Sequence, residues 1–441
     1  MKLPKSAMDP YQVLTEALVF NNQDEERWWQ STAPILGKMM KDACYDVHLQ
    51  YKYLCLHRTC VIPALGPYPR TNELRWKCIL TRYGLPFELS FNYPQGLVRT
   101  VWEPIGALTG TMNDPFNTQM IWKSVDTLSQ LIPGVNLNWF KHFVRELVTT
   151  DEEDLEILKK HKDVGIFKTQ NMLAFDYDKD GGNARAKVYL YPQLKSLATG
   201  ISTKDLMLDS IRKADVEGNL NSQLSILEEY MASRTLDTNG HEADVSSSLI
   251  PCFLSFDLVE PRASRVKIYL AENEVSFQRI EDLWTLGGRR TDLRTIAGLQ
   301  YLKDLWEALP LEEGHRTPSN IIYDLGKCAP METLSLIINF VLHPNDPLPQ
   351  PQIYFFVGGH NDLLVADALT SFFQRVGWKD IAESYKPNIS AYHPGLDLSE
   401  STQLQSWVSY SFKDGAPYVS VYTQLFEPIH GVKSGKAGYG I

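Results

Sequence analysis

Alternating hydrophobic and polar residues mark one segment of the chain as a half-buried β-strand. In residues 264–270, Arg265, Lys267 and Tyr269 alternate with three aliphatic residues. Successive side chains of a strand point to opposite faces, so one face is apolar and the other carries two cations and a phenol. A polar face of this kind usually meets solvent. Taken alone, the segment therefore favours a solvated face.

The same pattern recurs in other segments, each with basic, amide or phenolic groups on one side only. The polar faces carry Arg99 in 97–104; Lys187, Tyr189 and Tyr191 in 186–192; Gln352, Tyr354 and Phe356 in 351–357; and Tyr418, Ser420 and Tyr422 in 418–423. A single tyrosine on a strand is usually structural, because half-buried strands favour aromatic residues. The combination of tyrosines and cations on the same face of several strands points instead to one shared polar interior.

Strand patterns occur in five sequential pairs, with helical patterns between them. The pairs are 86–93 with 97–106, 171–178 with 186–194, 252–259 with 264–272, 334–342 with 350–357, and 406–412 with 416–426. Turn signals such as "KDGGNA" and "KDGA" join two of the pairs. Sequential pairing predicts an antiparallel sheet, and ten strands can close into a barrel wider than side chains alone can fill.

These patterns predict an α+β fold, a ten-stranded antiparallel β-barrel with a solvent-filled polar lumen. Strands whose apolar side faces outward need helices to cover them. We therefore expect α-helices around the barrel and the Lys, Arg and Tyr side chains inside it. The sequence has no linker that marks a second domain, so we predict one domain over 1–441, with an N-terminal helical segment at about 10–65.

Composition narrows the class of protein. The 441 residues carry a formal net charge of -10, which argues against a nucleic-acid surface. The six cysteines (Cys44, Cys55, Cys60, Cys78, Cys252 and Cys328) form no CxxC motif, which favours reduced thiols. The first residues have no apolar core of a signal peptide, and no stretch approaches the roughly 20 apolar residues of a membrane span. We predict a soluble cytoplasmic protein; the oligomeric state stays open, a homodimer included.

Cations that share a confined space repel one another and need an anion. Arg99, Lys187, Arg265 and Lys267 would together suit a multiply charged group such as diphosphate. Lys413 would join them, although its place beside the "KDGA" turn fits a solvated side chain equally well. The neighbouring tyrosine rings can stabilise a cation that forms when diphosphate leaves, and they can exclude water.

The sequence has no motif for a metal-bound or loop-bound phosphate. It has no DDxxD run, no GxxxxGK[ST] and no GxGxxG after a strand. The acidic cluster "DEEDLEIL" at 151–158 lies at a predicted helix start, where the helix dipole favours carboxylates. We therefore predict no metal site.

Several short motifs carry a resemblance to a known family. They are "IPALGPYP", "GLPFELSFNY", "VRTVWEPIG", "DPFNT", "KVYLYP", "SRVKIYL", "DLWTLGGRR", "NDPLPQPQIYF", "NDLLVADALT" and "YVSVY". Together they resemble the fungal dimethylallyltryptophan synthase (DMATS-type) family of indole and aromatic prenyltransferases, from the "ERWW" helix to "YVSVY". The family fold is the ten-stranded barrel ringed by helices that is called the ABBA or PT barrel.

The resemblance implies a role for each matching position. Arg99, Lys187, Arg265, Lys267, Gln352 and Lys413 match the diphosphate site, although many relatives carry arginine at the last of these. Tyr189, Tyr269, Tyr354 and Tyr422 match the shield around the allyl cation. Glu88 matches the catalytic glutamate that accepts the indole N–H, and Ile79, Leu80 and Tyr191 match acceptor-side positions. Ile337 matches a position in the prenyl pocket, where a bulky residue suits the five-carbon donor.

The function that this implies is metal-independent transfer of a dimethylallyl group from dimethylallyl diphosphate to an indole-containing acceptor. The reaction is a Friedel–Crafts alkylation in secondary-metabolite (alkaloid) biosynthesis. Dimethylallyl diphosphate is a substrate, so no cofactor is expected. The implied partners are small molecules, without nucleic acid or membrane.

Two positions depart from the branch of the family that alkylates free tryptophan. Met172 stands where that branch has a lysine base, and Cys252 stands where it has an arginine for the amino-acid carboxylate. A neutral acceptor is then better suited, such as a Trp-containing cyclic dipeptide, an indole diterpenoid or another indole. Glu88 becomes the candidate for the base that restores aromaticity.

Other functions fit parts of the pattern. Free tryptophan or a phenolic compound could be the acceptor. A non-catalytic carrier of an anionic aromatic ligand would explain the polar lumen but not Glu88 beside the cations. A metal-dependent terpene cyclase would need acidic metal-binding motifs, which the sequence does not have.

Overall fold

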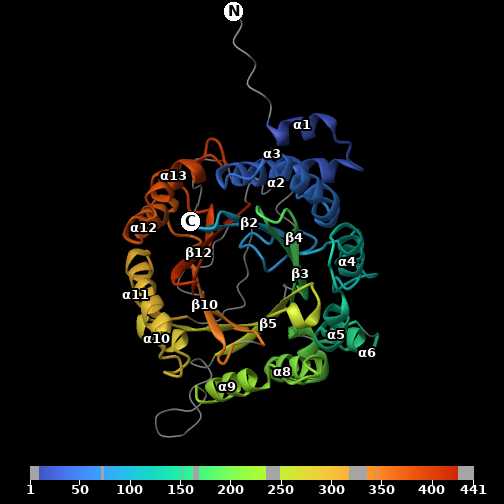
Figure 1. Ribbon diagram of the computed structural model, residues 1–441. Coiled ribbons are helices and arrows are strands. Elements are labelled where there is room, and N and C mark those ends of the chain that lie inside the picture. Colours follow the sequence, from blue (N-terminus) through green and yellow to red (C-terminus); the bar gives the residue numbers. More distant parts are fainter. Residues whose placement is uncertain are drawn as a thin grey trace, which may run out of the picture.

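Ten strands form one closed antiparallel barrel in the computed structural model, which describes residues 9–70, 74–150, 152–161, 168–234, 249–316, 335–344 and 346–425. The strands are β1 (Phe87–Tyr93), β2 (Leu97–Trp102), β3 (Asn171–Tyr177), β4 (Ala184–Leu190), β5 (Ile250–Asp257), β6 (Val266–Glu272), β9 (Leu336–Leu342), β10 (Gln350–Phe356), β11 (Gln405–Lys413) and β12 (Ala416–Gln424). Around the barrel the order is β1-β12-β11-β10-β9-β6-β5-β4-β3-β2. The predicted barrel and its five strand pairs are therefore confirmed (Figure 1).

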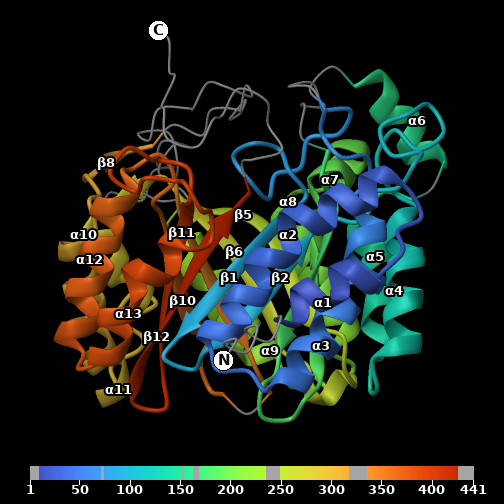
Figure 2. The same cartoon turned by 90° about the horizontal axis from the view of Figure 1, so that it is seen from above.

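All five turns within the strand pairs lie at one end of the barrel, because alternate strands of an antiparallel barrel run in the same direction. We call this the hairpin end. Figure 2 shows the β11–β12 and β1–β2 turns at the lower edge of the molecule. The opposite end, where the connections between strand pairs begin, is called the far end below.

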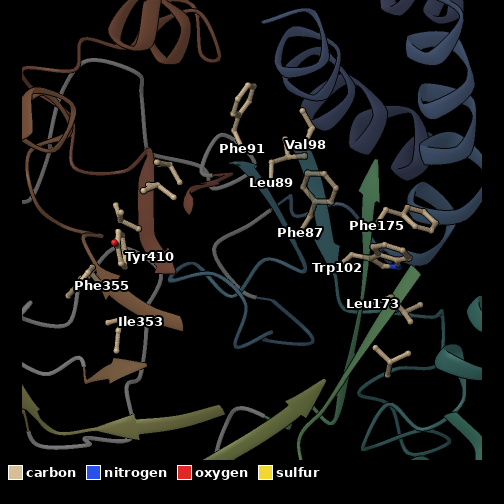
Figure 3. Close-up of a cluster of buried hydrophobic side chains, with 14 of the residues drawn as sticks. Phe87, Leu89, Phe91, Val98, Trp102, Leu173, Phe175, Ile353, Phe355 and Tyr410 are labelled. Atoms are coloured by element: carbon tan, nitrogen blue, oxygen red, sulfur yellow. The ribbon is translucent and has the colours of Figure 1, made fainter. Parts of the chain in front are cut away.

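The outward face of the barrel is apolar and packs against helices. Phe87, Leu89 and Trp102 are at most 1% exposed, as are Phe175 and Tyr410 farther around the barrel. These side chains point away from the lumen toward the surrounding helices (Figure 3). Burial of large apolar side chains is the main source of stability for such a layered fold, at roughly 1.5–3 kcal/mol each. The hydrophobic core of this protein thus lies between sheet and helices.

Helices follow one another around the barrel in chain order (Figure 1). The described helices are α1 (Pro10–Ala17), α2 (Gln23–Asp42), α3 (Val47–Leu56), α4 (Met120–Leu131), α5 (Asn138–Leu147), α6 (Glu152–Lys160), α7 (Gln193–Thr199), α8 (Thr203–Ala214), α9 (Asn221–Ala232), α10 (Phe277–Trp284), α11 (Leu293–Ala308), α12 (Asp362–Arg375) and α13 (Lys379–Ser390). Helix α2 shows how they begin: the Asn22 side chain accepts a hydrogen bond from the Glu25 N–H at 2.9 Å.

The structure differs from the sequence prediction in a few short elements. The predicted strand 186–194 ends at Leu190, and α7 begins at Gln193, because Pro192 has no N–H for a strand ladder. Within the predicted N-terminal helical segment, the backbone widens into a π-helical turn at His57–Val61. The two-residue strands β7 (Glu274–Val275) and β8 (Gly314–His315) pair with each other outside the barrel, and the sequence patterns did not predict them.

Cys44, Cys55, Cys60, Cys78 and Cys252 are free thiols, and Cys328 lies outside the described residues. In the part of the chain that the structure describes, no helix is both long enough and apolar enough to cross a membrane.

Candidate active site

The inward side chains of the barrel form successive layers between the hairpin end and the far end. On β4, Lys187 and Tyr189 point inward two residues apart, and Tyr191 follows just beyond the strand. The same step separates Lys267 from Tyr269 on β6. From the hairpin end inward we call the three levels the cation layer, at Lys187 and Lys267, the tyrosine layer, at Tyr189 and Tyr269, and the outer layer, at Tyr191. The arrangement places basic and aromatic groups of separate strands in one chamber.

The cation layer surrounds a cavity of about 540 Å³ that reaches the hairpin end. Its lining includes five of the six residues of the predicted diphosphate site: Arg99, Arg265, Lys267, Gln352 and Lys413. The sixth, Lys187, is paired with Asp176, which also lines the cavity. The prediction left Lys413 between the cavity and the solvent. In the structure it lies at the cavity, with its ammonium 3.7 Å from the centre of the Tyr418 ring.

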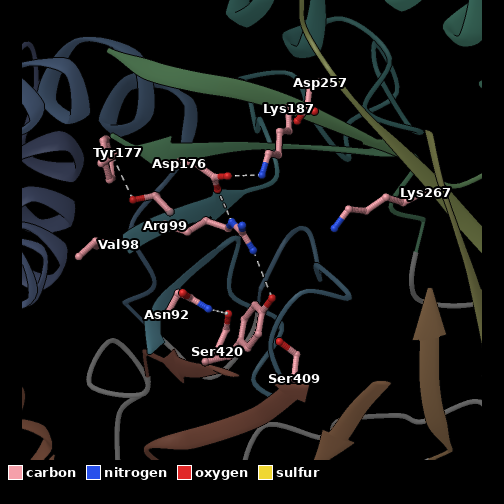
Figure 4. Close-up of polar contacts among 12 residues, drawn as sticks. Asn92, Val98, Arg99, Asp176, Tyr177, Lys187, Asp257, Lys267, Ser409 and Ser420 are labelled. Carbon is pink, nitrogen blue, oxygen red and sulfur yellow. Dashed lines mark hydrogen bonds and ion pairs between the residues drawn. The ribbon is translucent and has the colours of Figure 1, made fainter. Parts of the chain in front are cut away.

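Asp176 is shared by two cations at the centre of the cation layer. Its carboxylate accepts hydrogen bonds from the Arg99 Nε and the Lys187 Nζ (Figure 4). Burial disfavours these charges, but the attraction of Arg99 and Lys187 outweighs it and holds the pKa of Asp176 well below its usual value. Burial and repulsion by Arg99 lower the pKa of Lys187 to about 8, despite its pairing with Asp176.

The remaining cations are less well neutralised. The Arg265 Nε donates to Asp257 at 3.1 Å, and the Lys267 Nζ donates to the Gln352 side-chain oxygen at 3.3 Å. Burial, followed by repulsion from Arg265, lowers the pKa of Lys413 to about 7 and holds the pKa of Lys267 well below its usual value. A layer with five cations and two carboxylates can lower its own repulsion by binding a polyanion.

Gln352 is fixed by a network of amides and hydroxyls. Its Nε2 donates to the Ser409 hydroxyl at 3.1 Å, and its Oε1 accepts from Asn339 at 3.4 Å as well as from Lys267. The Asn339 amide also donates to the Tyr354 hydroxyl at 3.1 Å. Gln352 therefore connects the cation layer to the tyrosine layer with a defined orientation.

The four predicted tyrosines form a continuous arc directly above the cations. Ring centroids are 6.1 Å apart between Tyr189 and Tyr269, 6.0 Å between Tyr269 and Tyr354, and 6.0 Å between Tyr354 and Tyr422. The Arg99 Nη1 donates to the Tyr422 hydroxyl at 3.4 Å, which joins this layer to the one below. Ile337 on β9 lies directly opposite Tyr354 on β10 and packs against the same ring cluster.

Glu88 lies one step beyond the tyrosines, in the outer layer. It pairs across the sheet with Gln424, two residues from Tyr422 on β12. Its side chain is buried, and its Oε1 accepts a hydrogen bond from the Ser406 hydroxyl at 2.7 Å. Burial raises the pKa of Glu88 to about 8, although the Ser406 hydrogen bond acts in the opposite direction. A carboxyl group with this pKa can exchange a proton near neutral pH.

Aromatic and sulfur side chains make up the rest of the outer layer. The Tyr191 ring stacks on Phe253 at 4.5 Å between centroids, and its hydroxyl donates to the Met172 sulfur at 3.6 Å. Leu80 packs against the apolar cluster that contains Met172 and Tyr191. Ile79 differs, because its side chain is 40% exposed and only its backbone N–H is fixed, by the Thr169 hydroxyl at 3.2 Å.

Cys252 carries no charge at the position where related enzymes were expected to have arginine. Its thiol donates to the Ile250 carbonyl at 3.2 Å, and burial raises its pKa to about 12. Together with Met172, it leaves these two positions without a cation.

Several residues of the chamber were missed by the sequence analysis. They are Asp176, Asp257, Phe253, Asn339, Ser406 and Ser409. Asp176 lies directly opposite Arg99 on the neighbouring strand, so it has the same inward phase. Extending the alternation through residues 171–177 would have identified it. Phe253 stacks on Tyr269 with centroids 4.2 Å apart, and the alternation predicts its inward direction as well.

Among the residues that the structure describes, no group of three or more His, Cys, Asp or Glu side chains is placed to hold a metal ion. The cations and amide of the cation layer are the groups that this part of the chain offers to a phosphate.

Comparison with known proteins gives a consistent result. The model of a family described as tryptophan dimethylallyltransferase matches residues 24–388. The tryptophan dimethylallyltransferase of Penicillium roqueforti is 44% identical over 418 residues, which cover 95% of this chain and 88% of that protein. The crystal structure of AnaPT from Neosartorya fischeri superposes with a TM-score of 0.83 at 30% identity, and the match covers 96% of this chain and 100% of AnaPT.

A second solved structure is that of NotF in complex with brevianamide F and DMSPP. It has a TM-score of 0.79 at 31% identity and covers 95% of this chain and 98% of NotF. The family and the fold predicted from the sequence are thereby confirmed. The chain belongs to the tryptophan dimethylallyltransferase family and is a dimethylallyl-transferring prenyltransferase with a PT-barrel fold.

Proposed function

We propose that the protein transfers the dimethylallyl group of dimethylallyl diphosphate to the indole ring of an acceptor other than free tryptophan. The order of the layers is the observation that carries this proposal. A site for a polyanion lies two residues below an arc of four tyrosines, and a buried carboxyl group lies one step above them. A linear donor with an anionic head and an apolar tail fits that sequence of environments.

The cation layer holds the diphosphate. Arg99 and Arg265 offer planar donors, Lys187, Lys267 and Lys413 offer point charges, and Gln352 donates through its amide. Because Asp176 and Asp257 pair with only part of this charge, the arriving diphosphate relieves repulsion among the cations. The same preorganised charges stabilise the diphosphate as its bond to the allyl carbon breaks.

The tyrosine layer protects the cation that results. The carbon–oxygen bond breaks with its electron pair on the diphosphate, which leaves a dimethylallyl cation. The rings of Tyr189, Tyr269, Tyr354 and Tyr422 offer electron-rich faces and exclude water from it. Ile337 bounds the space next to Tyr354 and limits the length of the prenyl chain.

Glu88 acts on the acceptor. As a carboxylate it accepts the indole N–H, which raises the electron density of the ring as the ring attacks the allyl cation. The new carbon–carbon bond leaves a positively charged ring, and its proton passes to Glu88 to restore aromaticity. A donor N–H favours the ionised form of Glu88, so acceptor binding lowers a pKa that burial has raised.

The acceptor that we propose is neutral. The curated relatives are named for tryptophan, whereas the NotF structure contains brevianamide F. In this chain the uncharged Met172 and Cys252 occupy the positions where the family resemblance places a base and a carboxylate-binding arginine. The outer layer around Met172, Tyr191 and Leu80 is apolar and suits the body of an indole compound without zwitterionic charges. The acceptor backbone would lie along Ile79 and Leu80.

A mass-spectrometric screen tests the activity and the acceptor together. The protein is incubated with dimethylallyl diphosphate, EDTA and one acceptor at a time: free tryptophan, a Trp-containing cyclic dipeptide, an indole diterpenoid or a simple phenol. We expect a mass gain of one prenyl unit with a neutral indole compound and little with tryptophan. Turnover of free tryptophan above that of all neutral indoles would contradict the proposed acceptor. Loss of turnover with EDTA, restored by a divalent cation, would contradict the metal-independent mechanism.

A further inference from the structure

The cavity of the cation layer continues to the outside of the molecule at the hairpin end. Its lining runs from Lys267 and Gln352 inside the barrel to Gln95 in the β1–β2 turn and Asp180 in the β3–β4 turn. Gln95 and Asp180 are both exposed to solvent. The diphosphate site therefore has an opening of its own, at the end of the barrel opposite Glu88.

A line of cations leads inward from this opening. The exposed fraction of the side chain falls from 26% at Arg265 to 12% at Arg99 and 5% at Lys187. Arg185 lies one step farther out than Lys187 on β4, directly opposite Asp176, and it is exposed. Because residues two apart on a strand share a face, Arg185 continues the inward row of β4 to the rim of the cavity.

The β3–β4 turn adds one more cation and two carboxylates at the rim. The Lys179 ammonium donates to the Ala43 carbonyl at 3.4 Å, which holds it at the cavity wall. Asp178 Oδ1 accepts the backbone N–H groups of Asp180 and Gly181, at 2.9 and 3.0 Å, so it shapes the turn. Asp180 is the exposed carboxylate of the rim and opposes the attraction of Arg185 for an anion.

The layer order makes the two ends of the barrel unequal for a diphosphate. An anion that came from the far end would cross the apolar outer layer and the tyrosine arc, where it would lose hydration before it met a cation. A donor that comes from the hairpin end moves with its prenyl tail first. Its tail then enters the tyrosine layer while its head stops among the cations.

We propose that the prenyl diphosphate enters, and the diphosphate product leaves, through the hairpin end, with Arg185 as the anion-steering contact at the rim. This inference rests on the proposed function of the cation layer. The acceptor would then use the far end, so that the two substrates reach the tyrosine layer from opposite sides. Exposed charges at a rim act mainly on the association rate constant and on its dependence on salt.

Stopped-flow fluorescence with inorganic diphosphate tests the route. We expect Arg185→Gln to lower the association rate constant roughly twofold to fivefold and to weaken its salt dependence, and Asp180→Asn to raise it by a similar factor. The matched control is Arg75→Gln at the far end, where the exposed Arg75 donates to the Gly106 carbonyl at 3.4 Å. We expect this control to bind at the wild-type rate.

Two results would overturn the route. One is a wild-type association rate constant in both rim variants, and the other is a decrease in Arg75→Gln that equals or exceeds that in Arg185→Gln. Thermal unfolding midpoints of the three variants exclude misfolding as the cause. Failure of the wild-type protein to bind diphosphate at all would instead refute the proposed function of the cation layer, so the two failures are distinguishable.

Discussion

Glu88 accepts a hydrogen bond of 2.7 Å from Ser406, although the two residues lie on strands separated by β12. The register of β11 against β12 shifts between Gln405 and Val408, as in a β-bulge. A bulge changes the direction in which the side chains beside it point. Here Ser406 lies at the register shift, and its hydroxyl points into the lumen toward Glu88. Ser406 is the only hydrogen-bond donor to the Glu88 carboxyl among the described residues, and its position thus depends on an irregularity of the backbone.

The value of kcat/KM for the acceptor should rise with pH up to about 8, the value to which burial raises the pKa of Glu88 in the acceptor-free protein. Below that pH, the ionised fraction of Glu88 falls tenfold per unit, so the rate should fall with a slope of one. The measurement is kcat/KM for the acceptor at saturating donor, because a bound diphosphate keeps the nearby lysines protonated. Glu88→Gln should lose about 100-fold or more in turnover and the pH dependence with it. If the rate of Glu88→Gln rose toward pH 8 in the same way as that of the wild type, Glu88 would not be the group that acts in the mechanism.

Ser406→Ala should move the same pH profile to higher pH. The Ser406 hydroxyl donates to Glu88 and favours its ionised form, so removal of that donor raises the pKa of Glu88 further. The rate on the high-pH plateau should change much less than the rate near neutral pH. Ser409→Ala is the matched control, since Ser409 contacts Gln352 rather than Glu88. An unshifted profile in Ser406→Ala would show that this hydrogen bond does not set the titration.

Asp176→Asn should destabilise the fold, because Arg99 and Lys187 then keep buried charges without their carboxylate. Loss of one partner of a buried pair typically costs about 3–5 kcal/mol. The pKa of Asp176 is depressed in the folded protein, so its contribution is fully present above the unfolded pKa of about 3.9 and is lost progressively as pH falls from there through the lower folded-state pKa.

Chemical denaturation at several pH values checks this expectation. The difference between wild type and Asp176→Asn should be largest near neutral pH and should shrink in acid. Added diphosphate should restore part of the lost stability, because it supplies the missing negative charge. Equal unfolding midpoints at neutral pH would contradict the role assigned to Asp176.

Ile337→Ala should widen the range of donors toward longer prenyl diphosphates. Ile337 packs against the tyrosine cluster opposite Tyr354, so a smaller side chain opens space at the end of the prenyl pocket. Product masses from competition between dimethylallyl and geranyl diphosphate measure the change. Ile338→Ala is the control, because Ile338 faces the outer core and is fully buried there. Exclusive use of the short donor by Ile337→Ala would show that this residue does not limit chain length.

Strand periodicity made the barrel predictable from the sequence. Lys267 and Tyr269 alternate strictly with aliphatic residues, and this alternation fixes both the strand and the direction of each side chain. The ion pairs were harder to foresee, since Asp257 and Arg265 come together only through the register of β5 against β6. The Ser406 contact could not be predicted at all, because a bulge breaks the regular alternation on which the prediction relies.

The two-residue step that places Arg185, Lys187 and Tyr189 on one wall makes strand length critical to this enzyme. Insertion of a single residue just before Lys187 would turn Val188 into the lumen and direct the lysine and the phenol towards the surrounding helices. Point substitutions, by contrast, leave the other positions in place. Evolution and engineering of this barrel should therefore proceed by exchange of individual side chains within its strands, and gain or loss of residues should be confined to the turns and helical connections.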